Sequence, residues 1–312
     1  MPRVTDGLGE AAVEAVRALV GAESIQVEAA GVGASNAVFY VATASGHDLV
    51  ARAARRPLAR FEMERLVMGW ASAQGVPVPT VYNLTTIRDI AVMVTDRLPG
   101  HRLADDDSPG YGRLAEQCGE ILAVVHSIPT HRFGNLAADG TGMRATLDGW
   151  FLDDLAPVVE RASSVCDRRA RQTLDRIVAR LERSRATLKD LPPQLAHGDF
   201  SPMNVLVQDG RVSGVVDWES AKSGPAALDF GWWDWFSTRH STPFAVDEML
   251  PGYCRRRDVD MDALTEQRQL VRLRITVGHV AWAADRDDPA SIDEAIAALH
   301  TLIAWPLHAR TR

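Results

Sequence analysis

The chain has 312 residues and a formal net charge of −7, so it is long enough to bury a large core and to form two lobes or domains. The acidic balance argues against a nucleic-acid-binding surface and is compatible with cationic ligands. The three cysteines are far apart, which suggests neither a zinc site nor a disulfide framework. The sequence shows neither a signal-peptide pattern nor an apolar run of about 18 residues, so we expect a reduced, cytoplasmic protein without a membrane partner.

The first part of the chain predicts one helix followed by three strands. Helical periodicity covers residues 8–21, and β-type segments follow over 24–30, 37–44 and 48–53. The turn between the first two strands contains Gly31, Gly33 and Ser35. A dinucleotide-binding turn requires a helix directly after its glycines, whereas this segment continues as a strand. Taken alone, such a turn is more often an ordinary hairpin, and only the motifs further along the chain favour a glycine-rich hairpin folded over nucleotide phosphates.

A second helix is expected over 58–74, followed by strands over 78–84 and 90–97 that complete an antiparallel sheet. The helix carries Glu62 and Glu64, which lie about 200° apart around its axis, so only one of them can face inward. The third strand ends at Arg52. Taken alone, Arg52 could be a surface arginine at the end of an edge strand.

From about residue 101 onward the pattern is nearly all helical, with buried stripes over 110–126 and 260–285. Four aromatic residues fall within residues 232–236, and successive helical side chains diverge by about 100°, so they cannot all face one core. We expect most of them to pack and at least one to be exposed, where it could line a ligand pocket.

One hairpin stands out within this helical region. Residues 205–208 and 211–216 are two short runs rich in β-branched residues, separated by Asp209-Gly210. Asp-Gly between two such runs is a strong hairpin signal, because both positions of a type I′ turn need a positive φ.

The hairpin brings two oxygen-bearing side chains to one end of the ribbon. A turn centred on Asp209-Gly210 pairs residue 202 with 217 and residue 204 with 215, so Asn204 and Asp217 are offset by about two residues, or roughly 7 Å. An amide and a carboxylate suit Mg²⁺, which usually takes one or two protein ligands and completes its octahedron with water and substrate phosphates. Asp199, in the loop just before, can reach the same space.

The segment His197-Gly-Asp199-Phe-Ser-Pro-Met-Asn204 with Asp217 resembles the catalytic loop and metal-binding hairpin of the aminoglycoside phosphotransferase family, a small-molecule branch of the protein-kinase-like superfamily. Gly198 stands where protein kinases have arginine, and Trp218-Glu219 follow the aspartate, as is usual in that branch. The segment 224–231, which contains Asp229, resembles the next conserved block. Weaker correspondences upstream extend the resemblance over most of the chain.

The resemblance implies an α+β fold with two lobes, a small antiparallel-sheet lobe with one main helix over 1–96 and a larger, mostly helical lobe over 97–312, with a hinge near 95–100. It implies ATP or GTP and Mg²⁺ as cofactors. Arg52 would hold phosphates in place of the usual lysine. Glu64 fits the family spacing better than Glu62 as its partner. Further nucleotide contacts are expected from the glycine-rich turn and from the backbone at the hinge (Gly31, Gly33, Ser35, Asp96 and Leu98).

In the implied reaction, Asp199 accepts the proton of the acceptor hydroxyl and orients its oxygen, while Asn204 and Asp217 hold the metal. His197 and Asp229 are expected to support the loop. The acceptor-side candidates are Glu219, Trp232, Asp234 and Asp285, with Asp287 and Asp288 not ranked against them. His126 is expected to be a packed, hydrogen-bonded histidine, and Asp105 to Asp107 a solvated turn.

The favoured function is transfer of the γ-phosphate of ATP or GTP to a hydroxyl of a small molecule, such as an aminoglycoside, by a monomer or homodimer whose activity would confer antibiotic resistance. A sugar or amino-alcohol kinase and a macrolide phosphotransferase share the same residues, and a fold does not determine the acceptor. A nucleotide-binding pseudokinase is the alternative from another class, motivated by Arg52. Retention of Asp199, Asn204 and Asp217 counts against it.

Overall fold

The computed structural model describes residues 7–21, 24–32, 36–106, 110–188, 191–240 and 245–304. The chain forms two compact units. The first, here called the sheet unit, comprises Met1–Ser108, Leu136–Gly140 and Met203–Glu219. The second, the helical unit, comprises Pro109–Asn135, Thr141–Pro202 and Ser220–Arg312. The lobe limits expected from the sequence, 1–96 and 97–312, stay a prediction.

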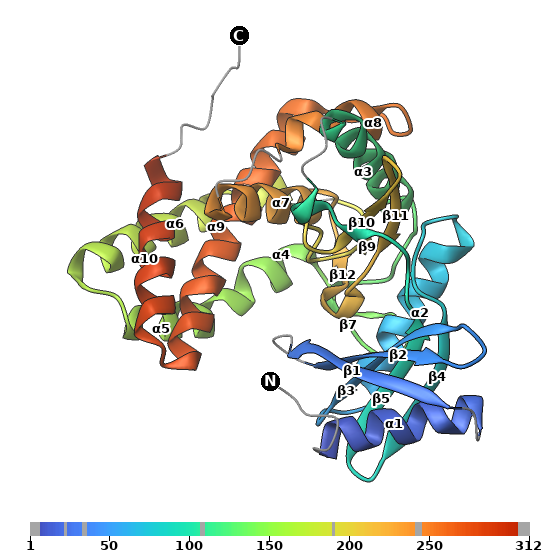
Figure 1. Ribbon diagram of the computed structural model, residues 1–312. Coiled ribbons are helices and arrows are strands. Elements are labelled where there is room, and N and C mark those ends of the chain that lie inside the picture. The colour runs from blue at the N-terminus through green and yellow to red at the C-terminus, as the bar shows by residue number, and fades with distance from the viewer. Residues whose placement is uncertain are drawn as a thin grey trace. The chain divides into compact units, whose positions relative to one another are not determined.

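The sheet unit is built on a five-stranded antiparallel sheet in the order β1-β2-β3-β5-β4 (Figure 1). Its strands are β1 (Ile25–Val32), β2 (Ala37–Thr43), β3 (Asp48–Ala54), β4 (Val81–Ile87) and β5 (Ile90–Asp96). Helix α1 (Gly7–Val20) packs on one face through Ala12, Ala15 and Val16. Helix α2 (Ala59–Ala73) follows β3.

Strand β2 alternates between a core face and a cavity face, as the two-residue period of a strand requires. Phe39 and Val41 are buried in the same cluster as α1. The intervening residues Val38 and Tyr40 line a cavity on the opposite face, together with Asn36 just before the strand. The hydrophobic pattern of this short segment thus decides which side chains are available to a ligand.

The expected hairpin is present as β10 (Val205–Gln208) and β11 (Arg211–Val215), with β6 (His101–Arg102) pairing on the other side of β10. Asp209 and Gly210 have φ values of 50° and 72°, as the predicted turn type requires.

The predicted register of this hairpin is wrong by one residue. Val205, not Asn204, lies opposite Val215, because the register shifts between Leu206 and Val207 and the second strand holds one extra residue. The Asn204 carbonyl accepts a hydrogen bond from the Val216 N–H at 2.9 Å. Asn204 therefore lies nearer to the level of Asp217 along the ribbon than the expected offset of two residues.

The helical unit contains a helix-rich fold and a small sheet. Its α-helices are α3 (Tyr111–Val125), α4 (Leu147–Phe151), α5 (Ala156–Ser164), α6 (Arg168–Arg183), α7 (Ala227–His240), α8 (Leu250–Cys254), α9 (Met261–Arg286) and α10 (Pro289–Ala304). Figure 1 shows α7 beside α9, and these two helices are in contact. Short 3₁₀ turns occur at Leu103–Asp105, Asp153–Leu155, Arg185–Leu188, Trp218–Ser220 and Val246–Glu248.

The expectation of an almost purely helical second half needs one correction. Strands β7 (Phe133–Leu136), β8 (Gly142–Arg144), β9 (Gln194–Ala196) and β12 (Lys222–Gly224) form a four-stranded sheet in the order β8-β7-β12-β9. Runs of three or four residues are too short for an alternating pattern to reveal them. The predicted α+β class, with an antiparallel-sheet unit and a mostly helical unit, is confirmed. No helix in the described ranges is long and apolar enough to span a bilayer.

Candidate functional site

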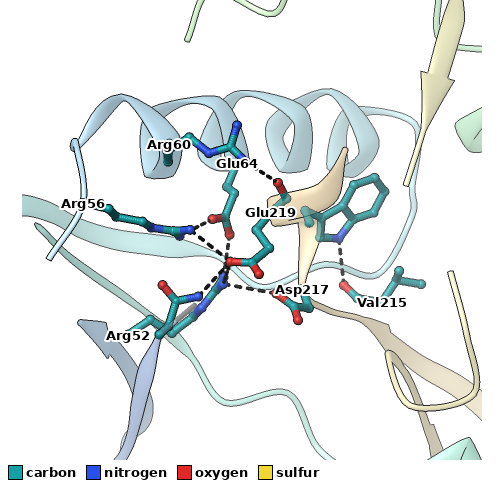
Figure 2. A network of polar contacts seen from close by, with 9 residues as sticks. Arg52, Arg56, Arg60, Glu64, Val215, Asp217 and Glu219 are labelled. Carbon is teal, nitrogen blue, oxygen red and sulfur yellow. Dashed lines mark hydrogen bonds and ion pairs between the residues drawn. The ribbon is translucent and has the colours of Figure 1, made fainter. Parts of the chain in front are cut away.

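The centre of the candidate site is Arg52 on β3, which lies opposite Val38 of β2 and Met93 of β5. Its guanidinium contacts three carboxylates (Figure 2). Nη1 lies 2.5 Å from Oε2 of Glu64, and Nη2 lies 3.1 Å from Oδ1 of Asp217 and 3.5 Å from Oε2 of Glu219. The planar, forked head of arginine makes this possible, whereas a lysine would present one compact charge.

Glu64 is the partner of Arg52, and Glu62 is not. The Glu64 side chain is fully buried on the inner face of α2, and its other oxygen accepts a hydrogen bond from Nη2 of Arg56 at 2.8 Å. Burial raises the pKa of Glu64 above its ordinary value, and the charges of Arg52 and Arg56 offset part of that shift. Glu62 is half-buried and forms no ion pair within the described ranges.

Asp217 lies just beyond the end of β11, after Val216, and has a left-handed backbone with φ at 64°. Aspartate tolerates this conformation better than most residues, although it still costs about 1–3 kcal/mol and tends to occur at functional sites. The turn directs the Asp217 carboxylate to Arg52, while the Trp218 indole N–H donates to the Val215 carbonyl at 3.0 Å (Figure 2).

Arg52, Asp217 and Glu219 line a cavity of about 550 Å³, which is formed entirely by residues of the sheet unit. That volume is typical of a site for a small molecule or cofactor. The polar part of its wall contains Arg52, Asn204, Asp217 and Glu219. The apolar part is formed by side chains from three strands and the hairpin, namely Val38, Val50, Met93 and Leu206. The wall thus combines an apolar slot with a charged end.

The segment after β5 contributes backbone groups to this cavity, which Asp96 and Leu98 also line. The Asp96 N–H donates to the Thr80 carbonyl at 3.2 Å, and the Arg97 N–H donates to the Asp48 carbonyl at 2.9 Å. No described residue accepts a hydrogen bond from the Leu98 N–H. A flat ring in the apolar slot could therefore use this donor.

Sequence reasoning missed two residues that contact Glu219, namely Arg56 and Asn36. Arg56 Nη1 lies 3.0 Å from Oε2 of Glu219, and the Asn36 side-chain amide donates to the same oxygen at 2.9 Å. Arg60 adds a hydrogen bond to the Glu219 backbone carbonyl. The pair Arg55-Arg56 directly after a strand was a usable signal, but nothing local shows which of the two faces inward.

Asp199 lies in the helical unit, in a loop shaped by Gly198. Gly198 has a φ of 79°, and a Cβ there would collide with the Ser220 carbonyl oxygen. Glycine is therefore required where protein kinases have arginine. The Asp199 N–H donates to Nδ1 of His197 at 3.3 Å, which ties this loop together. The convergence of Asp199 with Asn204 and Asp217 stays a prediction.

Asp229 braces the same loop. Its carboxylate accepts the backbone N–H groups of His197 and Gly198 at 2.9 and 2.7 Å and contacts Nε2 of His126 at 3.0 Å. Burial alone would raise the pKa of Asp229, but the hydrogen bond from His126 and the nearby histidine charges hold it below its ordinary value. His126, which also contacts the Tyr253 hydroxyl at 3.0 Å, is a packed, hydrogen-bonded residue.

The acceptor-side candidates are distributed over the helical unit, except for Glu219. Asp234 is largely buried against Arg268, at 2.9 Å, and Asp285 is exposed near Arg161, at 3.4 Å. Trp232 is half-buried. Burial raises the pKa of Asp234 above its ordinary value, and the Arg268 charge opposes that shift.

The remaining predicted residues lie in the glycine-rich turn. Gly31 belongs to β1 and pairs with Val38 of β2. Gly33 and Ser35 lie outside the described residues.

Asn204 and Asp217 are the residues that could hold a divalent cation, since both line the cavity and both offer oxygen ligands. Two protein ligands suffice for Mg²⁺ when phosphate oxygens and water complete the shell. Within the described ranges, no group of three or more His, Cys, Asp or Glu side chains is placed to hold a metal by itself. The donor set therefore fits a metal shared with a phosphate-bearing ligand better than a resident metal.

An antiparallel-sheet unit with an arginine–carboxylate cavity and a helical unit with an aspartate-bearing loop are the features of kinase-like small-molecule enzymes. The family model described as the phosphotransferase enzyme family (APH) matches residues 26–266. This match covers most of the chain, so the protein belongs to that family.

Two curated relatives show the same relationship. An aminoglycoside 3'-phosphotransferase of Streptomyces fradiae is 32% identical over 157 residues, which cover 47% of this chain and 54% of the relative. A hygromycin-B 4-O-kinase of Escherichia coli is 24% identical over 188 residues, covering 57% and 54%. The aligned parts therefore span about half the length of these relatives.

Solved structures share the fold. Aminoglycoside phosphotransferase APH(4)-Ia has a TM-score of 0.75 at 18% identity, covering 94% of this chain and 98% of that one. A thermostable mutant of the same enzyme has been solved in a ternary complex with AMP-PNP and hygromycin B. Macrolide 2'-phosphotransferase MphH from Brachybacterium faecium has a TM-score of 0.66 at 19% identity, covering 94% and 98%. At these identities the likeness establishes the fold.

Proposed function

We propose that this protein transfers the γ-phosphate of ATP or GTP to a hydroxyl group of a small molecule, with an aminoglycoside as the favoured acceptor. One observation carries the proposal: the Arg52 guanidinium bridges Glu64 and Asp217 at the charged end of a cavity that Asn204 also lines. This is the combination of cation and metal-type ligands that phosphoryl transfer requires. Family membership and the curated relatives support the reaction class and the acceptor class.

The cavity supplies a place for each part of a nucleotide. The base would occupy the apolar slot between Val38 and Leu206, next to the Leu98 N–H. Arg52, at the charged end, would bind the phosphates, since guanidinium groups form parallel paired bonds to phosphate oxygens. The glycine-rich turn, with Gly31, Gly33 and Ser35, would cover the phosphates.

Asn204 and Asp217 would hold Mg²⁺, which supplies neutralisation of phosphate charge when bound. Asp199 would accept a hydrogen bond from the acceptor hydroxyl, orient its oxygen towards the γ-phosphorus and take its proton. A new bond forms between that oxygen and phosphorus, the bond to the β-phosphate oxygen breaks, and the nucleoside diphosphate leaves. Asp229 and His197 would keep the loop in position for this step.

The decisive experiment measures nucleotide consumption with ATP and with GTP in the presence of aminoglycosides, macrolides, sugars and choline-like alcohols. Acceptor-stimulated turnover that is lost in Asp199→Asn, with nucleotide binding retained, would support the proposal. Absence of stimulation by any acceptor with either nucleotide would refute it and favour a nucleotide-binding module without turnover.

A macrolide is the second candidate acceptor, favoured by the fold shared with MphH and by the half-buried Trp232 in the helical unit. A macrolide needs a broad apolar surface, whereas an aminoglycoside needs carboxylates for its ammonium groups. Asp234 is largely buried and paired with Arg268 at 2.9 Å, whereas Asp285 is exposed and lies 3.4 Å from Arg161, so Asp285 is the more accessible of these two acidic candidates. The acceptor screen separates the two classes directly.

A further inference from the structure

Arg56 has the contacts of a functional residue, although no motif points to it. It lies just after β3, and its side chain is 15% exposed. One guanidinium nitrogen binds Oε1 of Glu64 at 2.8 Å and the other binds Oε2 of Glu219 at 3.0 Å (Figure 2). The guanidinium lies over the Phe61 ring, with Cζ 4.3 Å from the ring centroid. Two ion pairs and one aromatic face thus fix its position.

Arg52 and Arg56 bind the same two carboxylates from two sides. On Glu64, Oε2 pairs with Arg52 and Oε1 with Arg56. On Glu219, both arginines address Oε2, at 3.5 Å for Arg52 and 3.0 Å for Arg56. The four side chains form a closed ring of alternating charge. In a ring of this kind, each carboxylate keeps one cationic partner when the other cation leaves.

The proposed function requires Arg52 to leave part of this ring and bind phosphate, and the inference rests on that function. Nη2 of Arg52 contacts Asp217 and Glu219, and both line the cavity that would receive the nucleotide. Phosphate oxygens arriving there would compete with these carboxylates for the same nitrogen. Nη1 of Arg52 would stay paired with the fully buried Glu64. Glu219, which is 18% exposed, would lose Arg52 and keep Arg56, and a largely buried carboxylate without any cationic partner is strongly destabilised.

We propose that Arg56 is a positioning residue for phosphoryl transfer: it holds Glu64 and Glu219 in place so that Arg52 can turn Nη2 from Asp217 and Glu219 to the nucleotide phosphates. Glu219 links Arg56 to Asn36, because its Oε2 also accepts a hydrogen bond from the Asn36 side-chain amide at 2.9 Å. Asn36 lies just before β2, directly after the glycine-rich turn. Arg56 therefore stabilises both the Arg52 partner and the base of the segment expected to cover the phosphates.

The test compares nucleotide binding in the full-length wild type, Arg56→Met and Arg56→Lys, by calorimetric titration with ADP and Mg²⁺ and by steady-state kinetics. Methionine keeps a flexible stem over Phe61 but removes the charge. We expect Arg56→Met to weaken ADP binding and to raise KM for ATP at least about tenfold, as is common for residues that position a ligand-binding group. KM for the acceptor should stay within about twofold, since a positioning role affects only the phosphate side. Arg56→Lys should recover part of the loss.

Arg55→Met is the matched control, because Arg55 is adjacent, 58% exposed, and paired, among the residues that the structure describes, only with the exposed Asp89 at 2.8 Å. It should leave nucleotide binding unchanged. Combining Arg56→Met with Glu219→Gln should cost less than the sum of the two single changes, because both act on the same ion pair. Should Arg56→Met fail to fold, Arg56→Gln takes its place, since glutamine keeps one donor for Glu64.

Three outcomes overturn the inference and are distinguishable. A wild type that binds nucleotide, together with an Arg56→Met protein that binds it equally well, removes Arg56 from this role and leaves the proposed function intact. A wild type that binds neither ATP nor GTP removes the proposed function and the role of Arg56 with it. A loss of thermal stability in Arg56→Met with unchanged KM for ATP also counts against the inference, because it would show a purely structural residue.

Discussion

Replacing Glu64 by glutamine tests the arrangement on which the candidate site depends. The substitution keeps the size of a fully buried side chain and removes its charge. Arg52 and Arg56 each donate one hydrogen bond to a different oxygen of this carboxylate, at 2.5 and 2.8 Å. A glutamine amide can accept only one of these bonds, and its NH₂ group would face the other guanidinium as donor against donor.

The magnitude follows from this count. One hydrogen bond to a charged group is lost, worth about 1.5–3 kcal/mol, and a buried amide donor is left without an acceptor, which costs about 1–3 kcal/mol more. The arginines keep Glu219 as a partner, which limits the loss. We therefore expect Glu64→Gln to lower the free energy of unfolding by about 3 kcal/mol and to weaken nucleotide binding.

Urea unfolding monitored by tryptophan fluorescence measures the stability change, and ADP titration measures the binding change. Glu62→Gln, on the same helix but without an ion pair among the described residues, is the control and should stay within about 0.5 kcal/mol of the wild type. The reasoning is refuted if the two variants are equally stable, or if Glu64→Gln unfolds at the same urea concentration as the wild type.

Three further outcomes are expected. Asp199→Asn should lower kcat at least about 100-fold while ADP binding changes little; a variant with wild-type turnover would remove Asp199 from its role. Gly198→Ala should lower the free energy of unfolding by at least about 2 kcal/mol, because it adds a steric clash to the strain of a left-handed backbone. Gly210 has a φ of 72° and open space at its Cβ, so Gly210→Ala should cost only about 1 kcal/mol. Equal losses of stability in the two variants would contradict the clash at Gly198.

The pKa of His279 is lowered from its ordinary 6.5 to about 4, mainly by burial and to a smaller extent by repulsion from Arg239. The unfolded chain therefore binds more protons between these values. Stability should be complete above pH 6.5 and fall by roughly 2 kcal/mol as the pH drops towards 4. Urea unfolding at several pH values checks this, and His279→Gln should lose that part of the pH dependence if the assignment is right.

Local patterns were enough to predict most of the sheet unit. The alternation in β2 and the change from helical to strand periodicity lie within short stretches of chain, where each residue's preference is expressed directly. The Asp209-Gly210 turn was predictable for the same reason, since both residues adopt the positive φ that the hairpin requires. Family membership was predictable because the motif around His197 and Asp199 is contiguous.

The register of β10 and β11 could not be predicted in the same way. Turn residues set the pairing only next to the turn, and an extra residue in the second strand shifts everything beyond it. The short strands of the helical unit were also missed, because they are specified by their partners and not by their own composition.

The sequence by itself determined the class of the protein, the identity of its candidate catalytic loop, the strand that carries Arg52 and the hairpin that precedes Asp217. The resemblance to the family already favoured Glu64 over Glu62 as the partner of Arg52. Only the tertiary structure decided that Arg56 and Asn36 join Glu219. These contacts link residues up to 183 positions apart. Helix phase and strand register decide which side chains meet across such distances, and both depend on the packing of the whole unit.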